Sequence, residues 1–247
     1  MKTFCTMLKT ELRLSLRGMD MVIFALCLPL AALALLGLLY GTAPAFEGAD
    51  YTFLAQSFGA LSAISICAGG VMGLPLVVSD YRSRKILRRL RVTPVSPAML
   101  LLVQLAVYAL YAVCSLLLLF LAGKAFFGLH LGGSPLLFLL AHLLVTACTF
   151  SIGMLVGGVA RDTKTAGIIA SLLYFPMLLL SGATLPYEVL PGALQRLSDF
   201  LPLTQGIKLL KASALGLPME GVLWPVVLMI ALTALCAAAA IRFFRWE

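Results

Sequence analysis

Six long stretches of this chain contain no charged side chain, and they limit the fold more than any other feature. The stretches lie at 21–40, 54–79, 99–123, 134–160, 165–181 and 222–241, and every one of the 28 charged residues falls outside them. An α-helix needs about 20 apolar residues to cross the hydrocarbon core of a bilayer. The sequence lacks the alternating segments of about 10 residues that are typical of a membrane β-barrel. We therefore predict an all-α integral membrane protein with six transmembrane helices, in a single domain over residues 1–247.

Lysine and arginine are distributed unevenly between the segments that join these stretches. Fourteen of the 18 lie in 1–20, 80–98, 161–164 and after 241, whereas the alternate loops at 41–53, 124–133 and 182–221 hold four. Such residues concentrate on the cytoplasmic side of membrane proteins. We therefore expect a multi-pass protein of the cytoplasmic (inner) membrane with both termini in the cytoplasm. This topology accounts for the net charge of +8 without a nucleic-acid partner.

Residues 1–20 are predicted to form an amphipathic helix on the cytoplasmic membrane surface. At helical spacing, one face gathers apolar residues and the opposite side gathers basic ones. The apolar set is Phe4, Met7, Leu8, Leu12, Leu14 and Leu16, and the basic set is Lys2, Lys9, Arg13 and Arg17. Glu11 falls within the apolar arc. We expect its carboxylate to snorkel to water or to pair with a nearby arginine; a docking contact with another element is the alternative.

The segment 80–98 combines a narrow apolar face with many basic residues. Ile86, Leu87 and Leu90 share that face, and the remainder is filled by Arg82, Arg84, Lys85, Arg88, Arg89 and Arg91. Prolines at 94 and 97 end this predicted helix just before the third span. A short basic helix of this kind either anchors on anionic lipid headgroups or provides a surface on which a soluble partner pushes. The residues alone leave both uses open.

The last loop, at 182–221, is unusually apolar for a segment expected outside the cell. It is interrupted by Pro186, Pro191, Pro202 and Pro218, and we predict short helices over 193–200 and 203–215. So much apolar surface should not lie free in water. We therefore expect a re-entrant helical hairpin that is buried against the bundle before the last span.

Small and polar residues within the stretches suggest how the helices pack. The pairs Gly69/Gly73 and Gly153/Gly157 have the spacing that lets helix backbones approach closely, within the bundle or between two copies. For His142 we expect a neutral ring that hydrogen-bonds a neighbouring helix, rather than a pathway residue. The other polar side chains are candidates for lining a transport path or a dimer interface, with helix-packing hydrogen bonds as the alternative. They are Gln56, Gln104, Tyr108, Tyr111, Thr146, Thr149 and Tyr174.

The sequence contains no motif for catalysis, metal binding or ATP binding. Neither Gly-x-x-x-x-Gly-Lys-Ser/Thr nor His-Glu-x-x-His occurs, so we expect no catalytic residue, metal or cofactor on this chain. A proton- or sodium-driven carrier should place carboxylates within its spans, and the six stretches have none. If the chain transports a substrate, we therefore expect a partner protein to supply the energy and the substrate to be hydrophobic or amphipathic.

Two regions resemble the permease subunits of type-2 ABC exporters. The first, Leu90-Arg91-Val92-Thr93-Pro94-Val95-Ser96-Pro97, is similar to that family's boundary before the third span. The second is similar to its re-entrant segment and comprises Ser181-Gly182, Pro186, Glu188, Leu190-Pro191, Leu194-Gln195 and Leu201-Pro202-Leu203-Thr204. The order of elements also matches over essentially the whole chain: surface helix, two spans, cytoplasmic helix, three spans, hairpin and last span.

The resemblance implies roles for the segments outside the spans. Segment 80–98 would be a coupling helix received by a cytoplasmic ABC ATPase, with 1–20 as a connecting helix beside it. The coupling residues would be Glu11, Arg82, Arg84, Ile86, Leu87, Leu90 and Thr93. The hairpin would close the external end of the path through Ser181, Gly182, Pro186, Glu188, Pro191 and Pro202. ATP and Mg²⁺ would be bound by the ATPase, and the chain would pair with a second copy or a paralogue in the lipid bilayer.

The expected function is that of the membrane subunit of an ATP-driven exporter, which is not itself an enzyme. It would move a drug, lipid, glycan or peptide by alternating access at a dimer interface, and no residue selects among these cargos. Two alternatives belong to other classes. A membrane scaffold or assembly factor would act without any ATPase, and a gradient-driven carrier would keep its activity after ATP depletion.

Overall fold

The computed structural model describes residues 2–41, 43–46, 48–86, 97–183, 191–218 and 222–243. These residues form helices joined by turns and loops, and none of them belongs to a β-strand. Six helical segments are long and apolar enough to cross a membrane: Val22–Tyr40, Phe53–Ser83, Ala98–Phe127, Pro135–Val159, Thr163–Leu180 and Leu223–Arg242. Each coincides with one of the charge-free stretches. The predicted all-α class and the six spans are confirmed.

Each span is built from one to three helical elements. The first consists of the π-helix η1 (Val22–Cys27) and α2 (Leu28–Tyr40), and the second of α3 (Phe53–Cys67), η2 (Ala68–Gly73) and α4 (Leu74–Ser83). The other four are α6 (Pro97–Phe127), α7 (Pro135–Val159), α8 (Thr163–Leu180) and α11 (Leu223–Phe243). Outside the spans lie α1 (Lys2–Gly18), α9 (Gly192–Ser198) and α10 (Pro202–Leu215).

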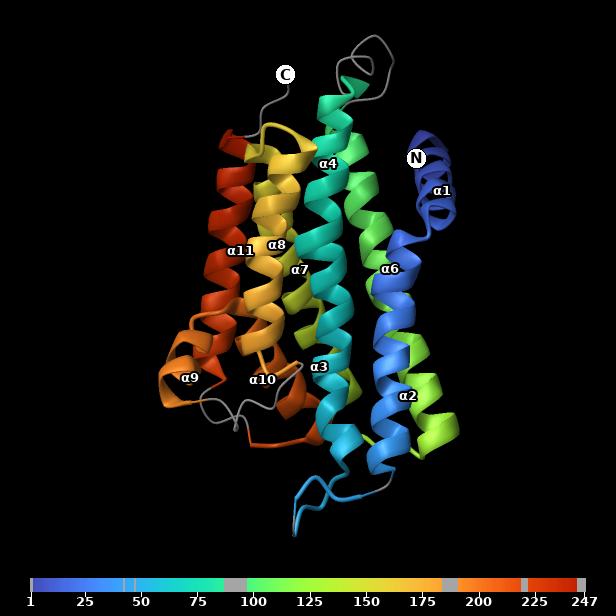
Figure 1. Cartoon of the computed structure of the whole chain (residues 1–247), viewed down its shortest axis with the longest axis vertical. Helices are drawn as coiled ribbons and strands as arrows, with labels where there is room; N and C mark the ends of the chain where they lie inside the picture. The colour runs from blue at the N-terminus through green and yellow to red at the C-terminus, as the bar shows by residue number, and fades with distance from the viewer. Residues whose placement is uncertain are drawn as a thin grey trace.

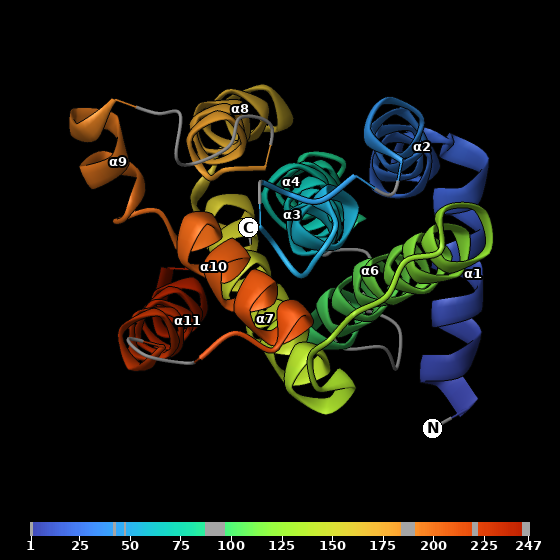
Figure 2. The same ribbon diagram turned by 90° about the horizontal axis from the view of Figure 1, so that it is seen from below.

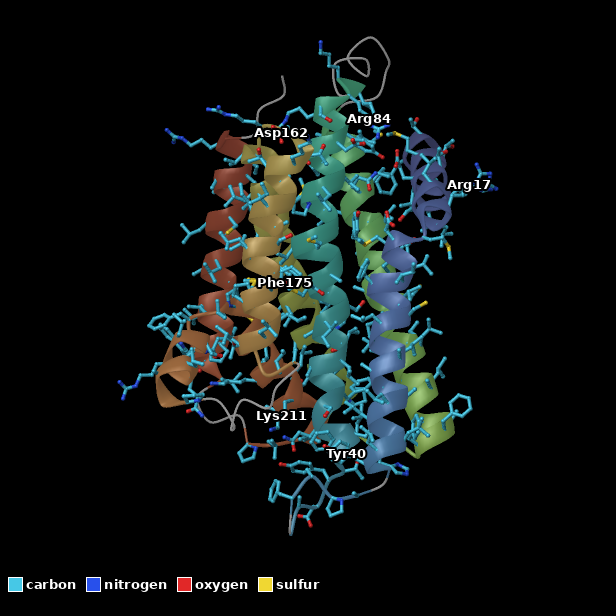
Figure 3. The ribbon with its side chains drawn as sticks, in the orientation of Figure 1. Arg17, Tyr40, Arg84, Asp162, Phe175 and Lys211 are labelled. Atoms are coloured by element: carbon cyan, nitrogen blue, oxygen red, sulfur yellow. The ribbon has the colours of Figure 1, made fainter. Side chains whose placement is uncertain are left out.

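The spans run along the long axis of the molecule, and α1 lies across one end of the bundle (Figure 1; Figure 2). We call this the α1 end; α9 and α10 lie at the opposite end, the α10 end. Arg17, Arg84 and Asp162 lie at the α1 end, whereas Tyr40 and Lys211 lie at the α10 end (Figure 3). The basic segments 1–20, 80–98 and 161–164 therefore have members on one side of the bundle, as the predicted alternation of spans requires.

The second span is the centre of the bundle. It is enclosed by α2, α6, α7 and α8 when viewed along the spans (Figure 2), and 83% of its apolar window is buried, against 17% for the fifth and the last span. Its residues are mostly small, with Gly, Ala and Ser interspersed among Ile, Leu and Val. Small side chains let several neighbouring helices approach one backbone at the same time.

Short-range chemistry explains where several helices begin and end. The Thr52 hydroxyl caps α3 by accepting the N–H of Ala55 at 3.2 Å, and the Asp162 carboxylate caps α8 by accepting the N–H of Thr165 at 2.7 Å. The bonds from Thr165 lower the pKa of Asp162 because they stabilise its charged form. At the other end of the bundle, Gly216 ends α10 with a positive φ of 68°.

The predicted pair of short helices between the fifth and sixth spans is present as α9 and α10. The larger of the two, α10, packs against α3 and α7, and buries Leu203, Ile207, Leu210 and Ala214 in the main core. Thus α10 lies against the bundle, whereas α9 is mostly exposed, with Leu194, Leu197 and the following Phe200 at the surface. Whether α10 enters the membrane stays a prediction.

Candidate functional site

Three polar side chains from distant parts of the sequence meet at the α1 end. The Tyr81 hydroxyl of α4 and the Gln104 amide of α6 both donate hydrogen bonds to Oε2 of Glu11 on α1, the second at 2.8 Å. Gln104 also donates to the Tyr81 hydroxyl at 3.0 Å. We call Glu11, Tyr81 and Gln104 the polar cluster. It joins the surface helix to the second and third spans.

The helix α1 docks on η1 and the third span through an apolar face. Phe4, Met7, Leu8 and Leu12 pack against a buried set on η1 and α6 that comprises Ala25, Val103, Val107 and Tyr111. Leu14 and Leu16, which we predicted on the same face, are instead exposed. Their side chains leave this face because the third span, which passes under α1, covers only one narrow stripe of a helix lying across it.

The docking alternative for Glu11 is the correct one. Its carboxylate binds Tyr81 and Gln104, so the expected pairing with an arginine of the same helix is wrong. Sequence reasoning also missed Tyr81. A tyrosine at the end of a span is the normal residue of the aromatic belt at a membrane surface, and nothing local distinguishes it from one that hydrogen-bonds a second helix.

The predicted coupling residues separate into different environments. Arg82 is buried, and its Nη1 donates to the carbonyl oxygen of Gly158 at 2.9 Å. Arg84 is exposed and forms an ion pair of 2.9 Å with Asp80, four residues earlier. Ile86 packs partly buried against Val78 and two leucines of α6. Arg82 thus contacts the C-terminal end of α7, where a guanidinium is favoured by the free carbonyls of the helix end. The coupling role of these three residues stays a prediction.

The remaining predicted coupling residues, Leu87, Leu90 and Thr93, lie outside the described residues. Their proposed contact with an ATPase stays a prediction.

The two arginines give a prediction for stability. Arg82→Ala should lower the free energy of unfolding by about 1.5 kcal/mol, because it removes a buried charged donor from a helix terminus. Arg84→Ala should lower it by less than about 0.5 kcal/mol, because an exposed pair four residues apart on a helix contributes little. Thermal unfolding of both variants in one detergent tests this; equal shifts for the two would contradict the buried position of Arg82.

Glycines let the second and fourth spans come into backbone contact. A β-carbon at Gly153 would overlap with the carbonyl oxygen of Gly70, and one at Gly157 would lie 3.0 Å from the β-carbon of Val78. A β-carbon at Gly70 would lie 2.9 Å from the Thr149 side chain. From the sequence, the pair Gly153/Gly157 could pack either within the bundle or between two copies. In the structure this pair packs within the chain, against the second span at Gly70 and Val78.

The predicted path residues do not form one lining. Gln104 belongs to the polar cluster, and Tyr108 and Tyr111 are buried on α6. Thr146 and Thr149 are buried and donate to carbonyls of their own helix, at 2.7 Å to His142 and 2.5 Å to Val145. Tyr174 is buried on α8, and Gln56 is half-buried near the start of α3. Their use as a path or interface stays a prediction.

His142 differs from its expectation. Its ring is buried beside Phe138, with ring centroids 6.3 Å apart. Within the described part of the chain neither ring nitrogen has a hydrogen-bond partner, so the expected bond to a neighbouring helix is absent there.

The predicted gate residues lie at the turns that connect α8, α9 and α10. Ser181 is buried and Gly182, with φ of 85°, follows it at the end of α8. Pro191 precedes α9 and Pro202 begins α10. Ser198 connects these turns through its hydroxyl group. The hydroxyl donates a hydrogen bond to the carbonyl oxygen of Leu180 at 2.7 Å and lies 3.0 Å from the hydroxyl oxygen of Thr204. Pro186 and Glu188 lie outside the described residues.

Comparisons with known proteins cover most of this architecture. A family model described as ABC-2 type transporter matches residues 2–215, from the start of α1 to the end of α10. The polar cluster and the turns around Ser198 both fall within this match.

Three curated proteins illustrate the similarity. Nodulation protein J of Rhizobium leguminosarum bv. viciae is 38% identical over 88 residues, which are 35% of this chain and 34% of that protein. The inner membrane transport permease YhhJ of Escherichia coli (strain K12) is 30% identical over 132 residues, 53% of this chain and 35% of that protein. Nodulation protein J of Rhizobium meliloti (strain 1021) is 34% identical over 110 residues, which are 44% of this chain and 40% of that protein. The matches thus span 34–40% of the length of these relatives.

Proposed function

Because this chain belongs to the ABC-2 type transporter family, we propose that it is the membrane-spanning permease subunit of an ATP-driven exporter. Its cargo is a hydrophobic or amphipathic molecule, since the six charge-free stretches within the spans offer no charged side chain that would accompany an ion. ATP and Mg²⁺ are bound by a separate cytoplasmic ABC ATPase. The permease acts as a pair, with a second copy or a paralogue, and opens alternately to the two sides of the bilayer.

The α1 end faces the cytoplasm in this proposal. The support is the excess of Lys and Arg in the segments at that end, because basic residues near spans are retained on the cytoplasmic side. The membrane is then the cytoplasmic (inner) one, and both termini are cytoplasmic. The turns at Ser181–Gly182, Pro191 and Pro202, which lie at the α10 end, form the external closure of the path.

The polar cluster is the observation that carries the proposal. A permease driven by an external ATPase needs elements at its cytoplasmic surface that move together with its spans. Glu11 joins the surface helix to both Tyr81 at the end of the second span and Gln104 in the third. Segment 84–97 connects these same two spans. A push on this segment is therefore transmitted to α1, α4 and α6 as one unit.

An ATPase assay tests this proposal with a matched pair of variants. The purified chain, reconstituted with the ABC ATPase encoded beside it, is expected to raise ATP hydrolysis. Leu87→Ser combined with Leu90→Ser should abolish that stimulation, because it removes the apolar face of the proposed coupling helix. Leu194→Ser combined with Leu197→Ser should leave it unchanged. These two residues have the same spacing on α9, are exposed, and lie at the opposite end of the bundle.

Two outcomes would favour other functions. If stimulation survives the change at 87 and 90, the segment is only a membrane anchor. If no neighbouring ATPase associates with the chain, the exporter proposal fails, and a scaffold or a gradient-driven carrier takes its place; persistence of transport after ATP depletion identifies the carrier.

A further inference from the structure

A small cavity lies at the α1 end, where the surface helix crosses the second and third spans. Its volume is about 260 Å³, and its walls come from α1, the turn after α1, the η2–α4 part of the second span, and α6. Leu76, Val77 and Met21 are apolar residues of its lining, and the three residues of the polar cluster line it as well. The cavity is therefore amphipathic.

Three carboxylates line this cavity, and no lysine or arginine of the described residues does. They belong to Glu11, Asp20 and Asp80. Asp80 is neutralised by its ion pair with Arg84. Glu11 accepts both of its hydrogen bonds from Tyr81 and Gln104 at Oε2. Because a carboxylate has about four acceptor positions, it retains the capacity to accept further hydrogen bonds. Asp20 forms no ion pair within the described part of the chain. At this cavity, no lysine or arginine of the described residues compensates the charges of Asp20 and Glu11.

Tyr108 is a second and independent indication of a ligand. It is only 3% exposed, and it lines the same cavity. A β-carbon at Gly69 would meet its Cδ1 at 3.3 Å, and one at Gly73 would meet its Cε1 at 2.5 Å. The ring therefore points along the second span from Gly69 towards Gly73, and so towards the cavity wall formed by Val77 and Asp80. No described residue accepts or donates a hydrogen bond at its hydroxyl.

We propose that this cavity binds the ammonium group of an amphiphilic organic cation. The cation lies between the carboxylates of Asp20 and Glu11 and beside the ring and hydroxyl of Tyr108, which attract positive charge together. The apolar body of the ligand packs on Leu76 and Val77. The cytoplasmic position of the site rests on the proposed function. The ammonium group belongs either to an aminophospholipid of the bilayer or to a soluble amine.

Calorimetry of the full chain in an uncharged detergent tests the proposal. The probe is benzylammonium, and benzyl alcohol is its neutral counterpart. We expect saturable binding of the cation alone. Asp20→Asn should weaken it about tenfold, because it removes the charge of an exposed side chain and leaves its size unchanged. Tyr108→Phe should weaken it about threefold, because only the hydroxyl is lost. Asp50→Asn makes the same charge change in the loop before α3, at the α10 end, and should have no effect.

The proposal is overturned if the wild-type chain binds benzyl alcohol as well as the cation, or does not bind the cation. It is also overturned if the Asp20→Asn variant has the same midpoint of thermal unfolding as the wild-type chain and binds the probe cation with the same affinity. No ATPase takes part in this assay, so its failure is separate from the failure of the exporter proposal.

A second arm identifies the source of the ammonium group. The probe affinity is measured in nanodiscs of phosphatidylglycerol with and without phosphatidylethanolamine. A lower affinity in the presence of phosphatidylethanolamine shows that the lipid headgroup competes for the cavity. Equal affinities show that the natural ligand is a soluble amine.

Discussion

Replacing Gly153 with alanine is expected to lower the free energy of unfolding by about 3 kcal/mol, although it adds a single methyl group. The new β-carbon would overlap with the carbonyl oxygen of Gly70, and backbone on the central span has no free space to move into. The fourth span would have to separate from the second. Thermal unfolding and the monodisperse fraction in detergent measure the effect.

Gly167 provides the matched control for this change. It lies in the fifth span, and a β-carbon there would be 3.5 Å from the Leu76 side chain, an ordinary contact. Gly167→Ala should therefore leave stability equal or slightly raised, because alanine is the better helix former. A similar loss in both variants would mean that the close approach of the second and fourth spans does not decide the stability of the bundle.

Replacing Glu11 with alanine is expected to detach the surface helix and to abolish ATPase stimulation. The change leaves the half-buried Tyr81 hydroxyl without its acceptor, and an unsatisfied donor costs about 1–3 kcal/mol. The Gln104 amide loses its bond to Glu11 and keeps the one to Tyr81. These bonds and one apolar face hold α1 on the spans. We expect faster tryptic cleavage after Arg13 and Arg17, because a detached helix exposes its backbone to the protease.

Lys9→Gln is the control for this experiment, since Lys9 is exposed on the same helix and lies outside the polar cluster. It should leave both the cleavage rate and the ATPase stimulation unchanged. Rapid cleavage in Glu11→Ala with full stimulation would show that α1 is held by the cluster but is not needed for coupling. Unchanged cleavage would contradict the role of Glu11 in docking.

The number and positions of the spans could be predicted almost completely from the sequence. The six spans and the pair of short helices before the last one are present, because each signal is contained in a single continuous segment. A charged side chain in hydrocarbon is costly at any position of a span, so a run of 17 to 27 residues without charge is informative by itself. Helix stops at Pro and Gly are local in the same way.

The roles of individual polar residues were less predictable. Arg82 and Arg84 are two residues apart in a basic segment, yet one is buried against Gly158 and the other pairs with Asp80 at the surface. Helical periodicity places them on different faces, but it does not show which face meets α7. Glu11 shows the same limit, because its apolar surroundings indicated a helix face and gave no indication of its partners.

Thus the sequence by itself determined the number of spans, their alternation and the absence of an ATP-binding motif on this chain. The folded bundle was needed to show that Gly70, Gly153 and Gly157 pack the second span against the fourth, and that Glu11 meets residues 70 and 93 positions away. The physical reason is the range of each interaction. Insertion into hydrocarbon depends on the composition of one segment, whereas a hydrogen bond between helices depends on how whole spans pack side by side.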